Sequence, residues 1–250
     1  MNRRIIAILV AALALLPLAA RADQAGYLYS YGVDESRYGD IVFAIDAYKP
    51  LGSPDASLRP YVDVFANDDS KTANGAVPRI YSDNYAGGAF GLQFTNEKGL
   101  RLFAQVGATT TIGSIASEPS GGDLRGGVQL YREWGGARGA YGNFYGSGTY
   151  YSRYHDAVFY NQLELGTATG GAHRIEYYVR PVLTFDSHPY YYDNVAEITA
   201  GVRFHPFGTR GPTFALEEAA GTYLRGDLLP PDVARTYLDF RPTIAYGVSI

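Results

Sequence analysis

The chain has 250 residues, a formal net charge of −4, 23 tyrosines, 30 glycines and no cysteine. The lack of cysteine excludes disulfide bonds, thiolate metal sites and a thiol nucleophile. The acidic balance argues against nucleic acid as a partner, because a nucleic-acid-binding protein carries a basic patch.

Residues 1–22 have the features of a secretory signal peptide. A short positive region is followed by the apolar run Ile5–Ala19, and Ala20–Ala22 contains the small residues that a signal peptidase recognises. The apolar run is shorter than the roughly 20 residues that a membrane-spanning helix needs. We therefore expect cleavage after residue 22 and a single exported domain, residues 23–250.

The exported part contains about twelve stretches in which every second residue is apolar, the pattern of β-strands with one apolar face. In chain order these stretches span Tyr27–Val33, Ile41–Ala47, Val62–Ala66, Phe90–Phe94, Leu100–Val106, Leu124–Leu130, Tyr141–Tyr154, Phe159–Leu165, Ile175–Phe185, Ala196–Phe204, Phe214–Leu216 and Leu238–Ile250. The register is ambiguous only in the Gly/Tyr-rich stretch Tyr141–Tyr154.

Turn-forming residues separate the stretches. Asn96–Gly99 is a short turn that predicts a hairpin between its neighbours. We expect loops at Asn67–Gly75 and Glu118–Gly122, where polar residues, proline and glycine accumulate. Glu218 interrupts the stretch that begins at Phe214, and we expect a bulge there.

Two folds produce such alternation. In a soluble sandwich the apolar faces meet in a core, whereas in an outer-membrane barrel they face lipid and the polar residues line the lumen. Export and the tyrosine content favour the barrel, because tyrosine forms the aromatic girdles at the bilayer interfaces. We predict an all-β, antiparallel transmembrane β-barrel of about 12 strands (range about 10–14). It would lie in the outer membrane of a Gram-negative bacterium, in contact with outer-membrane lipid.

Charged residues occur on the face opposite the apolar one. On lipid each would cost roughly 2–4 kcal/mol near the midplane, whereas in a lumen they can pair, and such pairs would narrow the interior. Neighbouring tyrosines could bind sugars by ring stacking. Filling the lumen and forming girdles at the bilayer interfaces are simpler roles for them. The candidate residues facing the lumen or a ligand are Arg101, Arg125, Tyr131, Tyr160, Glu164, Glu176, Tyr178, Arg180, Glu197, Arg203, Tyr237, Asp239 and Arg241.

One segment resembles a hydrolase fragment: Ser152 lies close to the pair His155-Asp156. Adjacent residues of a strand point to opposite faces, so these side chains are badly placed for a proton relay. His173, His188 and His205 have no metal-ligand spacing. We assign no catalytic residues, no metal site and no cofactor.

Several sequence blocks point to a known family. They are Tyr81–Tyr85 leading into Gly91–Phe94, Gly122–Gly135, Tyr151–Tyr154, Tyr192–Asn194 before Gly201–Phe204, and Tyr237–Arg241. These blocks resemble the C-terminal domain of the bacteriophage adsorption protein A (NfrA) family. The resemblance implies an outer-membrane barrel tied to exopolysaccharide export that also serves as a phage receptor, and it implies no catalytic residues. The helical-repeat region expected before the barrel is not in this sequence, so recruitment through such repeats would need another chain.

Three functions are therefore considered. The first is a non-enzymatic barrel for exopolysaccharide export or surface assembly, with polysaccharide and a periplasmic or inner-membrane secretion protein as partners. The second is a barrel enzyme that hydrolyses lipid or peptide, with His155 and Asp156 as its visible candidates. The third is a purely structural or surface-receptor barrel.

Overall fold

The structure is a computed structural model, which describes residues 26–37, 39–70, 84–112, 120–136, 138–171, 173–187, 194–208, 211–229 and 233–249. The expected signal peptide, residues 1–22, lies outside the described residues, as do residues 81–83 and 192–193 of the blocks that resemble the NfrA family. No helix in the described part of the chain is long and apolar enough to cross a membrane.

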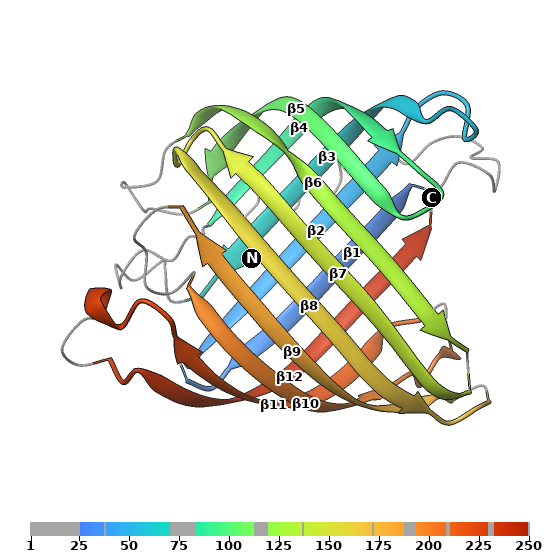
Figure 1. The fold of residues 1–250 in the computed structure, drawn as a ribbon, viewed down its shortest axis with the longest axis vertical. Helices are drawn as coiled ribbons and strands as arrows, with labels where there is room; N and C mark the ends of the chain where they lie inside the picture. The colour runs from blue at the N-terminus through green and yellow to red at the C-terminus, as the bar shows by residue number, and fades with distance from the viewer. Residues whose placement is uncertain are drawn as a thin grey trace.

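Twelve tilted antiparallel strands form one closed barrel, in which each strand pairs with its sequence neighbours and β1 pairs with β12 (Figure 1). The strands are β1 (Tyr27–Glu35), β2 (Asp40–Pro50), β3 (Leu58–Asp69), β4 (Tyr85–Thr95), β5 (Leu100–Thr111), β6 (Gly121–Gly135), β7 (Gly139–Tyr151), β8 (Asp156–Ala168), β9 (Ile175–Asp186), β10 (Val195–Phe204), β11 (Thr213–Tyr223) and β12 (Thr236–Ser249); a 3-10 turn, η5, spans Gly226–Leu228. The predicted fold class and strand number are confirmed.

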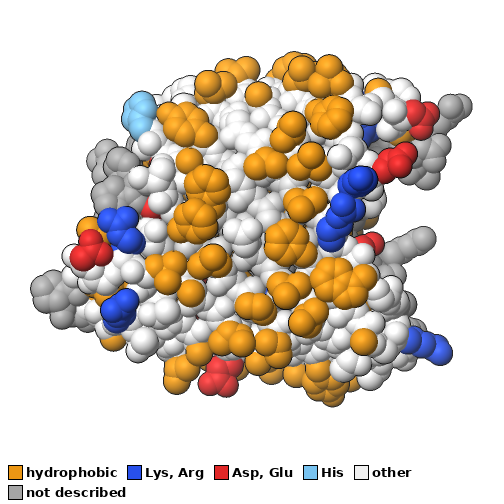
Figure 2. Space-filling view, in the orientation of Figure 1, with side chains coloured by type: hydrophobic (Ala, Val, Ile, Leu, Met, Phe, Trp, Pro, Cys, Tyr) orange, Lys and Arg blue, Asp and Glu red, His pale blue; other side chains and the backbone are white. Residues whose placement is uncertain are grey.

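The outer face of the wall is apolar. Side chains such as Val106, Ile198 and Leu238 are more than half exposed there, and Figure 2 shows hydrophobic side chains spread over the wall with few charged ones. Alternation places the apolar residues of β2–β6 and β8–β12 on this face, as expected. An apolar exterior around a polar interior is the arrangement of a barrel in lipid, so the fold is that of an outer-membrane β-barrel.

β1 departs from the expected facing. Tyr29 pairs with Asp46 and Gly247 on the lumen side, whereas Leu28 pairs with Val248 on the lipid side. The tyrosines of β1 therefore line the lumen, as most of the described tyrosines do. The described tyrosines that point outward are Tyr150, Tyr177 and Tyr246. Lumen filling therefore accounts for more of the described tyrosines than interface girdles do, because a tyrosine hydroxyl finds hydrogen-bond partners in a polar lumen as readily as at the bilayer interface.

The two ends of the barrel differ in the length of their connections. The segments 96–99, 136–138 and 169–174 are short, and the start of β1 and the end of β12 lie on their side. The other end carries the longer connections 70–84 and 224–235. Outer-membrane barrels have short periplasmic turns and longer external loops. We call the ends periplasmic and extracellular accordingly.

β11 is regular, and the expected bulge at Glu218 is absent. The strand pairs without interruption along its length with β10 and β12. Glu218 occupies an outward position opposite Ala200 and Phe240, and it is exposed near the middle of the strand. The preceding residue, Glu217, points into the lumen and is buried. An acidic residue in the apolar pattern thus marks a charge on the lipid face and not a break in the strand.

A repeated contact fastens the extracellular ends of neighbouring strands. A serine directly after one strand accepts a hydrogen bond from a backbone N–H of the neighbouring strand that precedes it around the barrel. That N–H belongs to the residue that follows an aspartate, and we call this contact the serine clasp. In one case the Ala157 N–H donates to Ser187 Oγ over 2.9 Å, and Ser187 Oγ donates to Asp156 over 2.7 Å. The serines of the clasps are Ser36, Ser70, Ser152 and Ser187, and the aspartates are Asp239, Asp40, Asp123 and Asp156.

Replacing Ser187 with alanine is expected to destabilise the barrel by about 1–3 kcal/mol, because the fully buried Asp156 loses its hydroxyl donor. The urea midpoint of unfolding, followed by the gel shift of unheated protein, measures this loss. Ser57→Ala, at an exposed position of the periplasmic end, is the control. Equal midpoints for the two variants would show that the clasp contributes nothing.

Candidate functional site in the barrel lumen

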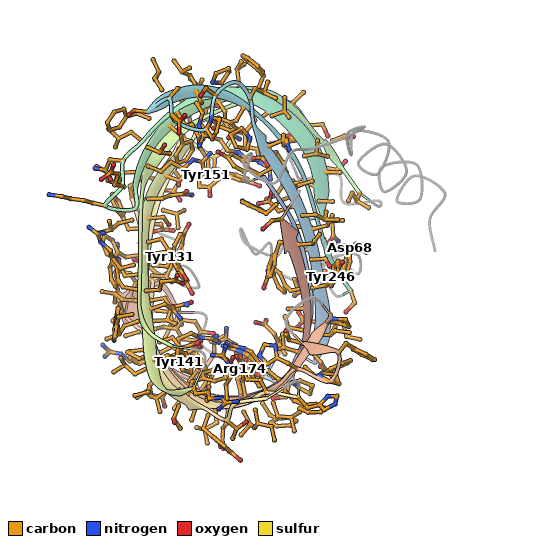
Figure 3. The ribbon with its side chains drawn as sticks, turned by 90° about the vertical axis from the view of Figure 1, so that its right-hand side faces the viewer. Asp68, Tyr131, Tyr141, Tyr151, Arg174 and Tyr246 are labelled. Carbon is orange, nitrogen blue, oxygen red and sulfur yellow. The ribbon has the colours of Figure 1, made fainter. Side chains whose placement is uncertain are left out.

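The structure places all the candidate residues on the inner face of the wall. Figure 3 looks along the barrel, and the labelled Tyr131, Tyr141, Tyr151 and Arg174 lie along its inner side. The position of each candidate follows from strand register, because residues opposite one another in neighbouring strands share a face. Whether these residues contact a ligand remains a prediction.

A first group of charges, the glutamate–arginine cluster, consists of Glu164, Glu176, Arg180, Arg203 and Glu217. Arg203 donates to Glu176 over 2.7 Å and to Glu164 over 3.0 Å. Arg180 donates to both oxygens of Glu217 over 2.9 Å and lies 3.6 Å from Glu164. The cluster is a continuous network from β8 to β11, and it includes four of the sequence candidates.

Two tyrosines complete the glutamate–arginine cluster. The Tyr178 hydroxyl donates to Glu217, and its ring lies 4.5 Å from the Arg203 guanidinium carbon. The Tyr141 hydroxyl is 3.3 Å from Glu164 and 3.2 Å from Glu176. Because these hydroxyls saturate carboxylate oxygens, the charges are held in fixed positions on the wall.

A second group, the rim cluster, lies near the extracellular end and consists of Arg37, Glu197, Tyr237, Asp239 and Arg241. Arg241 donates to both oxygens of Glu197 over 2.7 Å and to Asp239 over 2.7 Å. The Tyr237 hydroxyl donates to Glu197 over 2.8 Å. Arg37, from the β1–β2 connection, stacks over the Tyr237 ring at 3.9 Å. All four sequence candidates of this region are therefore in one network.

Arg101 is held by neutral groups. It donates to Gln93 over 2.7 Å and to Gln129 over 2.9 Å. Its guanidinium carbon lies 4.7 Å from the Tyr48 ring and 4.8 Å from the Tyr61 ring. Amide oxygens and ring faces both stabilise a cation, so this arginine keeps its positive charge on the wall without a direct carboxylate bond.

The remaining candidates lie apart from the two clusters. Arg125 donates to Asp123 over 2.6 Å. Tyr160 donates to Gln162 over 2.8 Å. Tyr131 donates to Glu133 over 2.9 Å in an exposed position near the periplasmic end. The sequence pattern thus located the face of these residues, but not their neighbours.

The ion pairs follow the wall and do not cross the lumen. Arg203 in β10 binds Glu164 in β8, and Arg241 in β12 binds Glu197 in β10, so each pair spans two strands of the same side. This arrangement differs from the expectation that pairs of charged side chains narrow the lumen. A cavity of about 570 Å³ occupies the extracellular half of the lumen, and its walls carry Tyr31, Tyr85, Tyr151, Tyr154, Tyr160 and Tyr237, with arginines between them.

The segment that resembles a hydrolase fragment has structural contacts. Asp156 accepts hydrogen bonds from the backbone and hydroxyl of Ser187. Ser152 Oγ accepts from the Leu124 N–H over 2.7 Å. His155 is exposed and has a φ of 54° in the turn between β7 and β8. Ser152 and Asp156 therefore act in serine clasps. Among the described residues, no group of His, Asp and Glu could hold a metal ion.

Sequence reasoning missed several contributors to these networks, among them Tyr141, in a stretch of ambiguous register, and Asp123. Glu217 was hidden because Glu218 beside it broke the expected alternation, although the inward positions Ala215, Glu217 and Ala219 fit the period of two. Arg37 and Arg153 lie in connections between strands, where no alternation exists to assign a direction. Only the folded barrel brings these connections over the lumen.

Comparisons with known proteins found distant similarity to solved outer-membrane structures and no family. No family model matches the chain, so membership of the NfrA family is not shown, and no curated protein matches it. A bacterial polysaccharide outer membrane secretin is 8% identical, with a TM-score of 0.47 over 92% of this chain and 100% of that chain. An outer membrane channel from Pseudomonas putida F1 is 12% identical, with a TM-score of 0.47 over 92% and 97%. LpxR from Salmonella typhimurium is 10% identical, with a TM-score of 0.44 over 89% and 98%.

Proposed function

We propose that this protein is a non-enzymatic outer-membrane barrel through which an exopolysaccharide crosses to, or assembles at, the cell surface. The observation that carries the proposal is the cavity of about 570 Å³ in the lumen, lined by tyrosine rings and arginines. Its volume is in the range of small-ligand sites and accommodates a few sugar units. A periplasmic or inner-membrane secretion protein would deliver the polymer.

The chemistry of the lining suits a sugar chain. Tyrosine rings stack against the C–H faces of sugars, and arginines and fixed carboxylates exchange hydrogen bonds with hydroxyl groups. Toward the periplasmic end Tyr27 and Tyr29 present exposed rings to the lumen, and the Tyr27 ring is stacked 5.2 Å from the buried Tyr48 ring. An extended polymer could thus move along successive rings without one tight binding site.

Deletion of the gene is expected to lower surface polysaccharide or biofilm matrix. Tyr178→Ala and Arg180→Ala should reproduce part of this loss, because both side chains shape the glutamate–arginine cluster. The neighbouring Tyr177→Ala is the matched control, since Tyr177 points to lipid. Polysaccharide is measured on whole cells, and the gel shift of unheated protein checks folding. Normal polysaccharide after deletion would refute the proposal.

The enzyme alternative and the export proposal predict different effects of replacing His155. If the barrel hydrolysed lipid or peptide with this residue, His155→Ala would abolish the hydrolysis while leaving the fold intact. The export proposal expects His155→Ala to keep normal polysaccharide. Hydrolysis by the purified protein that depends on His155, together with unchanged polysaccharide after deletion, would replace export with catalysis.

A further inference from the structure

The ion pairs of the lumen wall have a consistent depth order, in which the acid lies deeper than the arginine. Arg203 keeps 24% of its side chain exposed, whereas its partners Glu164 and Glu176 keep 3% and 5%. Arg180 is 18% exposed, and its partner Glu217 is 8% exposed. The carboxylates are therefore set into the wall, and guanidinium groups cover them on the lumen side.

The same order holds toward the extracellular end. Arg125 is 11% exposed against 2% for Asp123, and Arg241 is 11% exposed against 0% for Asp239. Side-chain length explains the order, because a short carboxylate stays near its own strand while an arginine reaches over it. Glu35, close to the extracellular end of β1, is as exposed as Arg241 and is the exception.

This depth order decides which charge a solute meets first. The chain as a whole is acidic, but a molecule in the lumen approaches guanidinium N–H groups before it approaches a carboxylate. A guanidinium has five N–H donors. The bonds of Arg180 to Glu217 come from one nitrogen, Nη2, and its Nη1 lies 3.6 Å from Glu164, so an anion that binds here would share this guanidinium with two wall carboxylates.

The cavity adds two arginines held by rings. The Arg153 guanidinium carbon lies 4.3 Å from the Tyr85 and Tyr154 rings, and Arg125 lies 4.1 Å from the Phe65 ring. Rings stacked on a guanidinium cover its faces and direct its N–H edges sideways. Arg125 already donates its Nε N–H to Asp123, so a carboxylate on a sugar would meet the Nη side of this guanidinium.

Carboxylates also line this cavity. Glu35, Asp46, Asp63 and Glu197 face it, together with five arginines, Arg37, Arg125, Arg153, Arg180 and Arg241. The Tyr27 hydroxyl donates to Asp46 over 3.3 Å and fixes that carboxylate at the wall. Among the described residues of the cavity lining, the arginines outnumber the carboxylates by one.

We infer that the polymer taken by this lumen is an acidic polysaccharide, one that carries carboxylate groups on its sugars. The inference deepens the proposed export function and rests on it. The partly exposed arginines would bind the carboxylates in succession, while the tyrosine rings contact the sugar faces. The deep carboxylates keep the arginines in place, so that the polymer meets a fixed row of cations instead of flexible side chains.

Calorimetry of the purified, folded barrel in detergent tests this inference with two defined probes. Hexagalacturonate supplies the carboxylates, and maltohexaose is a neutral chain of the same length. We expect hexagalacturonate to bind about tenfold or more tightly than maltohexaose, and its affinity to fall as salt rises. Arg125→Gln and Arg153→Gln should each weaken hexagalacturonate binding severalfold. Arg132→Gln, on the outward face of the same strand as Arg125, should leave it unchanged.

Each outcome decides the inference separately from the export proposal. Equal binding of the two probes would overturn the preference for an acidic chain, while export would still stand on the deletion phenotype. Binding of neither probe would also overturn the inference. Unchanged hexagalacturonate binding in folded Arg125→Gln and Arg153→Gln protein would show that the cavity is not the site. Acid-selective binding without a deletion phenotype would instead support the site and reject export.

Discussion

Replacing Val202 with arginine is expected to lower the yield of assembled barrel. Val202 lies on the outer face of β10, between Tyr177 and Leu216 of the neighbouring strands, and 41% of it is exposed where lipid would be. A basic side chain on the lipid face costs about 2–4 kcal/mol at the bilayer midplane and about 0–1 kcal/mol near the interfaces, and Val202, two residues before the periplasmic end of β10, lies between these limits. The yield of heat-modifiable barrel in outer-membrane fractions measures the effect.

The matched control for this change is Thr184→Arg, on the lumen face of the adjacent strand. Thr184 lines the cavity, so an arginine there has space and water. Thr199 is not an equivalent control: it is fully buried and its hydroxyl is 3.1 Å from Glu197. Similar yields for Val202→Arg and Thr184→Arg would mean that the wall does not separate lipid from lumen as the structure shows.

Two adjacent glutamates are expected to respond to the same substitution with opposite signs. Glu217→Leu should destabilise the barrel by about 2–3 kcal/mol, because Arg180 loses its bidentate partner and the Tyr178 hydroxyl loses its acceptor. Glu218→Leu should stabilise it by about 1 kcal/mol, because a carboxylate leaves the lipid face and an apolar side chain replaces it.

Urea unfolding of the two variants in lipid vesicles gives the comparison directly, since both remove one negative charge from one strand. The difference between their midpoints therefore reports the facing of the residue and not the net charge. If Glu218→Leu also lowered the midpoint, Glu218 would have a stabilising partner at the outer surface. If Glu217→Leu were neutral, the glutamate–arginine cluster would contribute nothing to stability.

The amino-acid sequence by itself determined the architecture of this protein. In stretches such as Leu238–Ser249, every second residue is apolar, and the period of two is a property of any single strand. The same period placed Arg180, Glu197 and Arg241 on the polar face before their partners were known. About twelve such stretches, together with the expected export and the tyrosine content, favoured a barrel over a sandwich, and the period of two assigned most of the charged lumen residues to their face.

Only the tertiary structure decided the facing of β1 and the partners of the charged residues. The tyrosines of β1 are apolar enough for lipid and polar enough for a lumen, so the pattern of one strand cannot choose; closure against β2 and β12 makes the choice. The contacts of Arg203 with Glu164 and of Arg241 with Glu197 depend on the register between strands. Register is a relation between distant segments, and it arises only when the barrel closes.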